Sequence, residues 1–363
     1  MLRILSLALL LSVFCAGSAQ ATADCTYAGG DANGAPLLKR GINLSRWWED
    51  DRRQALKSDD VKNLHTLGFD FVRLPLSPSS LVMNDESELK QRLAQLRCDI
   101  ISLLNQNLAV IVDLHAPERF QRNLAQDTEA EATQHLENLW QRMLPVLAGL
   151  PPSRVLLGLY NEPQIEAEPW WRIQGQLVKN LRTVFPDNPM VVTAGPDGGP
   201  WNLERMQAYD DKNIIYDFHF YQPMQFTHHG ADWLSSYKPG DKSVRITYPV
   251  TLKSQMDESN PRVKDYMATN WNRLRLSAYI DKATAWAKEN NAKIACLEFG
   301  VFRPYVDSDS RAHWLADMRF LLERDHIPWA MWEYRGGFGL LSDEGAPDES
   351  VLKALNLKRS AAR

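Results

Sequence analysis

Two glutamates stand at or near the ends of strongly apolar runs. Glu162 directly follows the run Val155–Asn161, and Glu298 lies near the end of the run Lys293–Phe299. Cleavage of a glycosidic bond uses such a pair, with one group protonating the leaving oxygen and the other attacking the sugar or activating water. We therefore predict that Glu162 is a general acid/base, its pKa raised by partial burial and by the neighbouring negative charge. We predict that Glu298 is an ionised nucleophile.

Other apolar runs also finish in polar or aromatic residues, which indicates one convergent site. Arg73 would favour the ionised form of Glu298, because a nearby cation stabilises a carboxylate. Asn161 would donate a hydrogen bond to a sugar hydroxyl, and Trp332 offers a flat apolar face to a pyranose ring. The remaining candidates at the ends of such runs are Asn43, His115, His219 and Tyr221.

Short apolar runs alternate eight times with helical patterns along the chain. Several of these runs are apolar on both faces, as in parallel strands that helices cover. This alternation predicts an α/β fold, a closed (β/α)8 TIM barrel, whose catalytic groups project from the C-terminal ends of its strands. No linker or repeat divides the chain, so we expect a single domain over residues 22–363. The expected strands are Leu38–Asn43, Phe69–Pro75, Leu108–His115, Val155–Asn161, Met190–Thr193, Ile214–Tyr221, Lys293–Phe299 and Pro328–Tyr334, and the clearest helical patterns are Ser87–Asn105, Thr133–Leu147, Leu276–Glu289 and Asp309–Glu323.

A long loop insertion, Gln222–Asn272, follows the sixth expected strand and shows no clear periodicity. Loops of this length are usually functional or disordered, and disorder is unfavourable for a segment so rich in aromatic residues. We expect an ordered cap over the barrel mouth, with aromatic side chains that line additional sugar sites.

Four tryptophans lie in or near the expected loops at the strand ends, namely Trp47, Trp48, Trp201 and Trp233. Sugar rings stack on flat apolar faces of this kind. We expect about half of the four to contact substrate and take Trp47, Trp48 and Trp233 as candidates.

Six short motifs occur in one order over residues 37–341. They are Phe71-Val72-Arg73-Leu74-Pro75, Asp113-Leu114-His115, Asn161-Glu162-Pro163, His219-Phe220-Tyr221, Leu297-Glu298-Phe299-Gly300 and Trp332. Their types, order and positions resemble the signatures of glycoside hydrolase family 5, the cellulase-type family of (β/α)8 retaining β-glycosidases.

The resemblance implies a retaining double displacement that needs no metal and no cofactor. The resemblance also implies that Glu162 is the acid/base and that Glu298 is the nucleophile. Arg73 and Tyr221 would hold Glu298, and Trp332 would be the stacking platform. The sugar site bound before the cleaved bond would be shaped by His115, Asn161 and His219.

Several features of the sequence bear on metals and partners. Metal hydrolases on this barrel carry His-x-His after the first strand, where this chain has Asn43-Leu44-Ser45. The net charge of −4 argues against nucleic acid or an anionic membrane as a partner. We predict no metal site, and we expect a monomer whose partner is a polysaccharide or oligosaccharide substrate.

The N-terminus has the pattern of a Sec-type signal peptide over residues 1–21. Arg3 precedes the apolar stretch Ile4–Phe14, and Ala19-Gln20-Ala21 supplies small residues for cleavage. We therefore expect a secreted or periplasmic protein. Export permits a disulfide, for which Cys25 and Cys98 are the favoured pair, and Cys296 lies in an apolar run as a buried thiol.

Within this chemistry, an endo-acting, cellulase-like β-glucanase is the leading hypothesis. A β-mannanase, a β-1,3-glucanase and an exopolysaccharide-associated β-glycosidase are the alternatives, because loop shape and one or two hydroxyl contacts decide between them. Two other classes stay open at this point. One is a catalytically silent carbohydrate-binding barrel, and the other is a periplasmic partner of a polysaccharide secretion machine.

Overall fold

The structure is a computed structural model of the chain. It describes residues 25–29, 38–49, 57–231, 233–234, 244–251, 254, 256–342 and 344–358. The expected signal peptide, residues 1–21, lies outside the described residues.

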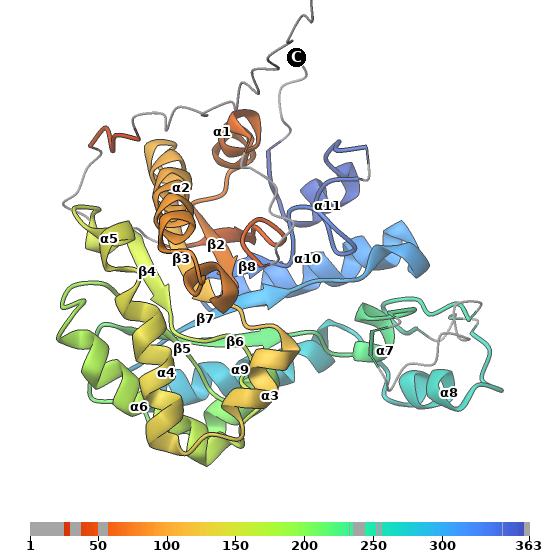
Figure 1. Ribbon diagram of the computed structural model, residues 1–363. Coiled ribbons are helices and arrows are strands. Elements are labelled where there is room, and N and C mark those ends of the chain that lie inside the picture. Colours follow the sequence, from red (N-terminus) through yellow and green to blue (C-terminus); the bar gives the residue numbers. More distant parts are fainter. Residues whose placement is uncertain are drawn as a thin grey trace, which may run out of the picture.

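Eight parallel strands form a closed barrel in the order β1 to β8, and β8 pairs with β1 (Figure 1). This confirms the predicted (β/α)8 TIM barrel. Most strands begin and end within a few residues of the predicted runs, but the fourth and eighth are shorter than predicted. The strands are β1 Arg40–Asn43, β2 Phe71–Leu76, β3 Ala109–Leu114, β4 Val155–Gly158, β5 Met190–Thr193, β6 Ile214–Phe220, β7 Lys293–Phe299 and β8 Trp329–Met331.

Two apolar layers hold the barrel together, because alternate side chains of a strand point to opposite faces. On β3, Ile111 points into the barrel, whereas Val110 and Val112 belong to the outer layer under the helices. The inner layer mixes large and small side chains, so that Phe71 fills space that neighbouring small residues leave. A Cβ atom at Gly41 would lie 2.4 Å from the Phe71 ring, so glycine is required there. The inner layer consists of Phe71, Ala109, Ile111, Leu156, Val191, Ala295, Leu297 and Ala330.

Helices cover the outside of the barrel (Figure 1). The expected helix Thr133–Leu147 is two helices, and the second has a proline in its first turn, at Pro145. A capping box between Thr128 and Glu131 fixes the start of the first one. The α-helices are α1 Ser58–Leu67, α2 Glu86–Asn105, α3 Glu118–Leu124, α4 Glu129–Gln141, α5 Leu144–Leu147, α6 Ala167–Arg182, α7 Met224–Thr227, α8 Pro261–Ala268, α9 Arg273–Glu289, α10 Ser308–Arg324 and α11 Glu349–Ala354, and the 3-10 helices are η1 Pro78–Leu81, η2 Pro152–Arg154, η3 Pro196–Gly198, η4 Pro200–Arg205 and η6 Arg303–Tyr305.

The insertion after β6 differs from the expected cap. Its first part, which includes α7 and reaches Leu234, borders the barrel mouth. Its later described part packs against α10 on the outside of the barrel, and α8 lies beside α7 (Figure 1). Tyr248 packs on Phe226 and donates a hydrogen bond of 2.8 Å to Asp317 on α10. Tyr266 is buried and donates to the backbone carbonyl of Thr247. Phe226, Tyr248 and Tyr266 therefore form the insertion's own core and do not line the cleft.

A disulfide joins Cys25 to Cys98 on α2, as predicted, with 5.1 Å between the Cα atoms. Cys296 is a buried free thiol on β7. Among the helices that the structure describes, none has the length and apolar character needed to cross a membrane.

Candidate active site

A cleft of about 920 Å³ lies at the C-terminal mouth of the barrel. The parallel strands all deliver their C-terminal ends to this mouth, so residues far apart in the sequence meet there. Seven of the predicted site residues line the cleft, namely His115, Glu162, His219, Tyr221, Trp233, Glu298 and Trp332.

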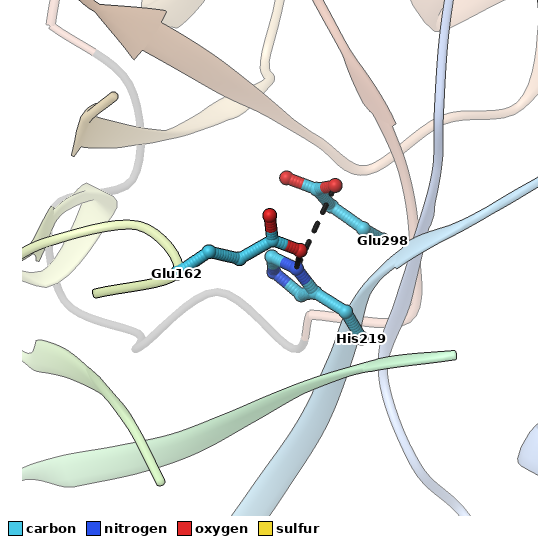
Figure 2. Close-up of side chains that lie close together, drawn as sticks. All are labelled: Glu162, His219 and Glu298. Carbon is cyan, nitrogen blue, oxygen red and sulfur yellow. Dashed lines mark hydrogen bonds and ion pairs between the residues drawn. The ribbon is translucent and has the colours of Figure 1, made fainter. Parts of the chain in front are cut away.

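The two predicted catalytic glutamates face one another across the cleft (Figure 2). One carboxylate oxygen of Glu162 and one of Glu298 lie within 4.8 Å of each other and of a His219 nitrogen. Glu162 follows β4 with a φ of 36°, a left-handed conformation unusual for a residue with a side chain. Gln121 supports this turn by donating a hydrogen bond of 3.1 Å to the Glu162 carbonyl.

Glu298 is buried and held from two sides. Its Oε1 accepts a hydrogen bond of 2.5 Å from Arg73 Nη1, and its Oε2 accepts one of 3.0 Å from the Tyr221 hydroxyl. Arg73 is itself fixed, because it also donates to Asn43 Oδ1 and Asn161 Oδ1 and pairs with Asp113 at 2.9 Å. Arg73 therefore contacts Glu298 directly, and it lies within β2 instead of at the strand's end.

Asn43 and Asn161 act beneath the cleft surface. Asn43 is fully buried, and its amide nitrogen donates to the backbone carbonyls of Leu297 and Met331 at 2.8 and 3.2 Å. Asn161 is 3% exposed, and its amide nitrogen lies 3.3 Å from His115 Nε2. Both side chains therefore position charged neighbours of the two glutamates.

His219 lies between three carboxyl groups. Its Nδ1 is 2.6 Å from Glu162 Oε1 and 3.6 Å from Glu298 Oε2, and its Nε2 is 3.1 Å from Asp217 Oδ2 (Figure 2 shows the first two contacts). The loop after β5 packs directly on the ring, since a Cβ at Gly198 would lie 2.9 Å from the His219 Cγ atom. The imidazole is thus fixed in position and almost fully buried.

The pKa values of the two glutamates differ from the prediction. Burial raises the pKa of Glu298, and the charge of Glu162 adds to this, although Arg73 and His219 oppose it. Burial also disfavours ionised Glu162, but the hydrogen bond and the charge of His219 outweigh it and lower the pKa of Glu162. Although burial lowers the pKa of His219, the charges of Glu298 and Asp217 raise it well above its usual value. The charges around His219 therefore favour its protonated form, which the sequence pattern did not indicate.

His115 and Trp332 form one wall of the cleft. Their rings stack with 5.5 Å between centroids and an interplanar angle of 25°. Burial lowers the pKa of His115, but the Asp113 carboxylate, 3.6 Å from its Nδ1, and the charges of Glu49 and Glu298 raise it overall. The wall therefore joins a flat apolar face to a polar edge, which suits a sugar ring.

Residues 30–337 match the family model described as cellulase, glycosyl hydrolase family 5. The chain belongs to this family. Endoglucanase 3 of Fibrobacter succinogenes is 24% identical over 88% of the chain, and the match spans 53% of that longer protein. Endoglucanase C of Acetivibrio thermocellus is 26% identical over 82% of the chain and 91% of its own length.

Solved structures share the barrel of this family 5 glycoside hydrolase. Thermotoga maritima Cel5A, determined with mannotriose, aligns with a TM-score of 0.73 at 22% identity, over 88% of this chain and 98% of that one. The cellulose synthase subunit Z of Clostridioides difficile aligns with a TM-score of 0.71 at 24% identity, over 88% and 99% of the two chains.

Two of the tryptophan predictions for this glycoside hydrolase are wrong. Trp48 is 1% exposed, and its indole N–H donates a hydrogen bond of 3.0 Å to Asp99 on α2. Trp47 is 4% exposed and packs edge-on against Tyr334. Both side chains are turned into the core between barrel and helices, so they cannot stack on substrate.

Trp201 and Trp233 do reach the cleft of the hydrolase. They are 38% and 56% exposed. Trp233 packs edge-on against Phe302 with 4.8 Å between ring centroids, and Phe302 in turn packs on Phe338. Trp233, near the start of the insertion, therefore forms a second aromatic wall of the cleft together with Phe302 and Phe338.

The site also holds polar residues outside the predicted set. Asp217 contacts His219, and the cleft is further lined by Arg46, Glu49, Asp197, Gln222, His228 and Glu333. Burial lowers the pKa of His228 to about 4, and burial raises the pKa of Glu333 to about 7. Asp217 had a signal in the sequence, because it precedes His219 by two positions on the same strand, β6.

Glu162, His219 and Glu298 are also near enough to one another to bind one metal ion, among the residues that the structure describes. The charges argue for another use of this cluster. Arg73 already contacts Glu298, and both ring nitrogens of His219 face carboxylates, whereas a metal needs an unprotonated nitrogen. The donor set therefore fits ion pairs better than a cation site.

Proposed function

We propose that this family 5 glycoside hydrolase is an endo-β-glucanase that cleaves β-glycosidic bonds with retention of configuration. The observation that carries the proposal is the approach of Glu162 and Glu298, whose oxygens lie within 4.8 Å of each other. Retaining enzymes place their carboxyl groups about 5–5.5 Å apart, and inverting enzymes leave roughly 6.5–9.5 Å for a water molecule. The short separation favours direct attack by a carboxylate.

In the first step Glu298 is the nucleophile. Arg73 and Tyr221 each donate a hydrogen bond to one of its oxygens, which is the geometry of a held carboxylate. The Glu298 oxygen forms a bond to the anomeric carbon while the glycosidic C–O bond breaks. Glu162 gives a proton to the leaving oxygen, so the departing sugar leaves as an alcohol.

In the second step Glu162 is the base. Its side chain is 36% exposed, so water that enters after the first product leaves can reach it. Glu162 takes a proton from this water, whose oxygen displaces Glu298 from the anomeric carbon. Two inversions at one carbon restore the original configuration.

The open cleft supports action within a polysaccharide chain. Aromatic side chains border it on several sides, with Trp332 after β8, Trp201 on η4 and Trp233 in the insertion. Rings spaced along a groove suit a chain of sugars better than a single one. The relatives named endoglucanase support a β-glucan as the substrate, and Thermotoga maritima Cel5A has been determined with both mannotriose and cellobiose.

We also propose that the protein is exported through the signal sequence in residues 1–21 and acts in the periplasm or outside the cell as a monomer. The Cys25–Cys98 disulfide supports this, since such bonds persist in oxidising compartments. The proposed chemistry uses only carboxyl groups and water, and therefore needs no cofactor.

Product analysis tests the proposed function. The mature protein is incubated with carboxymethyl cellulose, mixed-linkage β-glucan, β-1,3-glucan and β-mannan, and product lengths are followed over time. We expect the first two to fall rapidly in viscosity and to yield a spread of oligosaccharides, while Glu298→Gln yields none. A preference for β-mannan or β-1,3-glucan, or release of one short product alone, would overturn the substrate or the endo action.

A further inference from the structure

Asp217 is a buried carboxylate that the mechanism above does not use. It lies on β6, two residues before His219, and is 4% exposed. A buried charge is costly unless it is paired and hydrogen-bonded. Its Oδ1 accepts a hydrogen bond of 3.0 Å from the backbone N–H of Leu297, and its Oδ2 lies 3.1 Å from His219 Nε2.

The contacts of His219 favour one protonation state of its ring. Nδ1 faces Glu162 Oε1 at 2.6 Å, while Nε2 faces Asp217 Oδ2 at 3.1 Å. A neutral imidazole has one N–H and one lone pair, so in either tautomer a lone pair would point at a carboxylate oxygen unless Glu162 itself were protonated and donated to Nδ1. The lowered pKa of Glu162 disfavours that arrangement. Only the doubly protonated ring donates to both carboxylates.

We propose that Asp217 is a positioning residue that keeps His219 doubly protonated, so that His219 stores the proton which Glu162 delivers to the leaving oxygen. The proposal rests on the acid/base role of Glu162 in the proposed function. It assigns Asp217 an effect on catalysis that acts through His219, because Asp217 hydrogen-bonds to His219 and Leu297 and not to Glu162 or Glu298.

The proton transfers balance as follows. When a sugar approaches, the Nδ1–H bond of His219 breaks and its proton passes over 2.6 Å to Glu162. His219 is then neutral, with Nε2–H still donating to Asp217. Glu162 passes the proton to the glycosidic oxygen as the C–O bond breaks. In the second step Glu162 takes a proton from water and returns it to Nδ1, so the site ends as it began.

Charged groups from several strands face His219. Glu162 follows β4, and Glu298 on β7 lies 3.6 Å from Nδ1. Arg73 on β2 and Asp113 on β3 form the next layer, paired with each other at 2.9 Å. Asp217 alone contacts Nε2 among the described residues. Loss of its charge therefore removes the partner that keeps Nε2 protonated through both steps.

Nitrogen-15 NMR of the histidine side chains tests the proposal without relying on catalysis. We expect both ring nitrogens of His219 to show the shifts of protonated nitrogens at pH 7 in the wild type, with assignment through His219→Gln. In Asp217→Asn the ring should titrate at least about 1 pH unit lower, because the anion is gone. An unprotonated His219 nitrogen in the wild type at pH 7 would overturn the proposal, even if the variant failed to fold.

The pH dependence of activity is the second measurement. In Asp217→Asn the basic limb of kcat/KM on β-glucan should move to lower pH by about 1 unit. An aryl cellobioside with an activated leaving group needs no acid in the first step, so its kcat/KM should change by less than about threefold. Equal losses on both substrates with an unmoved limb would show that Asp217 is only structural.

Asp99→Asn is the matched control. Asp99 is also a buried carboxylate, but it lies on α2, outside the barrel, where it accepts a hydrogen bond from the Trp48 indole. This variant should leave the pH profile and the His219 signals unchanged. Failure of the proposed function can be distinguished from failure of this proposal. If Glu162→Ala left glucan cleavage intact, the acid/base role would be wrong, whereas the NMR measurement would still report the protonation state of His219 independently.

Discussion

The two glutamates that we propose as catalytic lie in very different surroundings in the cleft. Glu298 lies within β7, and its side chain is 5% exposed, with Arg73 and Tyr221 bound to its two oxygens. Glu162 lies in the turn after β4, with a side chain that is 36% exposed and a left-handed backbone. His219 is its hydrogen-bonded side-chain partner.

The contrast matches the tasks of the two groups. A nucleophile acts from one fixed position, so a rigid strand and two donors are an advantage. An acid/base exchanges protons with the leaving oxygen, with water and with His219, so it needs access and a partner that also carries protons. The difference teaches how burial, hydrogen bonding and backbone position can suit two identical side chains to the two roles proposed for them.

Removal of the nucleophile should have the largest effect. Glu298→Gln keeps the shape of the side chain but cannot form the covalent intermediate, so kcat should fall by about 10⁴-fold or more on every substrate. Steady-state kinetics measure this, and circular dichroism checks that the fold is intact. Retention of more than about a tenth of the activity would show that the nucleophile is elsewhere.

Removal of the acid/base should have a smaller effect that depends on the substrate. Glu162→Ala should slow glucan cleavage by about 10²- to 10⁴-fold but spare the first step for activated aryl glycosides. Azide needs no base, so it should restore turnover on these substrates and yield a β-glycosyl azide. Absence of azide rescue, with equal losses on both substrates, would remove the distinction between the two glutamates.

The support of Glu298 ranks next. Tyr221→Phe removes one donor to Glu298 but keeps the ring that packs on His228 and Phe338. We expect kcat to fall by about tenfold to a hundredfold with little change in stability, since one hydrogen bond to a charged group contributes about 1.5–3 kcal/mol. Thermal unfolding serves as the control. An unchanged kcat would mean that Arg73 alone holds the nucleophile.

The fold and the meeting of Glu162 and Glu298 in one cleft were predictable from the sequence, because both depend on local patterns. Continuous apolar runs indicate strands that are covered on both faces, and Ala109–Leu114 is indeed buried along its whole length. Strand ends then place Glu162 and Glu298 at one mouth, whatever the details of the loops.

The predictions that were wrong concern side chains whose environment depends on contacts between segments distant in the sequence. Trp48 is buried because α2 presents Asp99 to its indole, 51 positions later in the sequence. The aromatics of the insertion are buried because Tyr248 finds Asp317 on α10. The low pKa of Glu162 depends on His219, 57 positions away, at 2.6 Å. No pattern within one segment reveals such partners.

The smallest effect should come from the aromatic wall of the insertion. Trp233→Ala should raise KM on long oligosaccharides by about threefold to tenfold and leave short ones nearly unchanged, because an exposed ring stacks on a sugar without holding the fold. Tyr248→Phe, in the insertion's own core, is the matched control and should change neither KM. Equal effects of the two variants would contradict the division between cleft wall and insertion core.

Proton NMR of the first product tests the retaining mechanism most directly. The wild-type protein hydrolyses a soluble β-linked oligosaccharide in the spectrometer, and anomeric signals are recorded before mutarotation. If Glu298 attacks and Glu162 then activates water, the new reducing end must appear first as the β-anomer. An initial α-anomer would show a single inversion and would contradict the roles given to both glutamates.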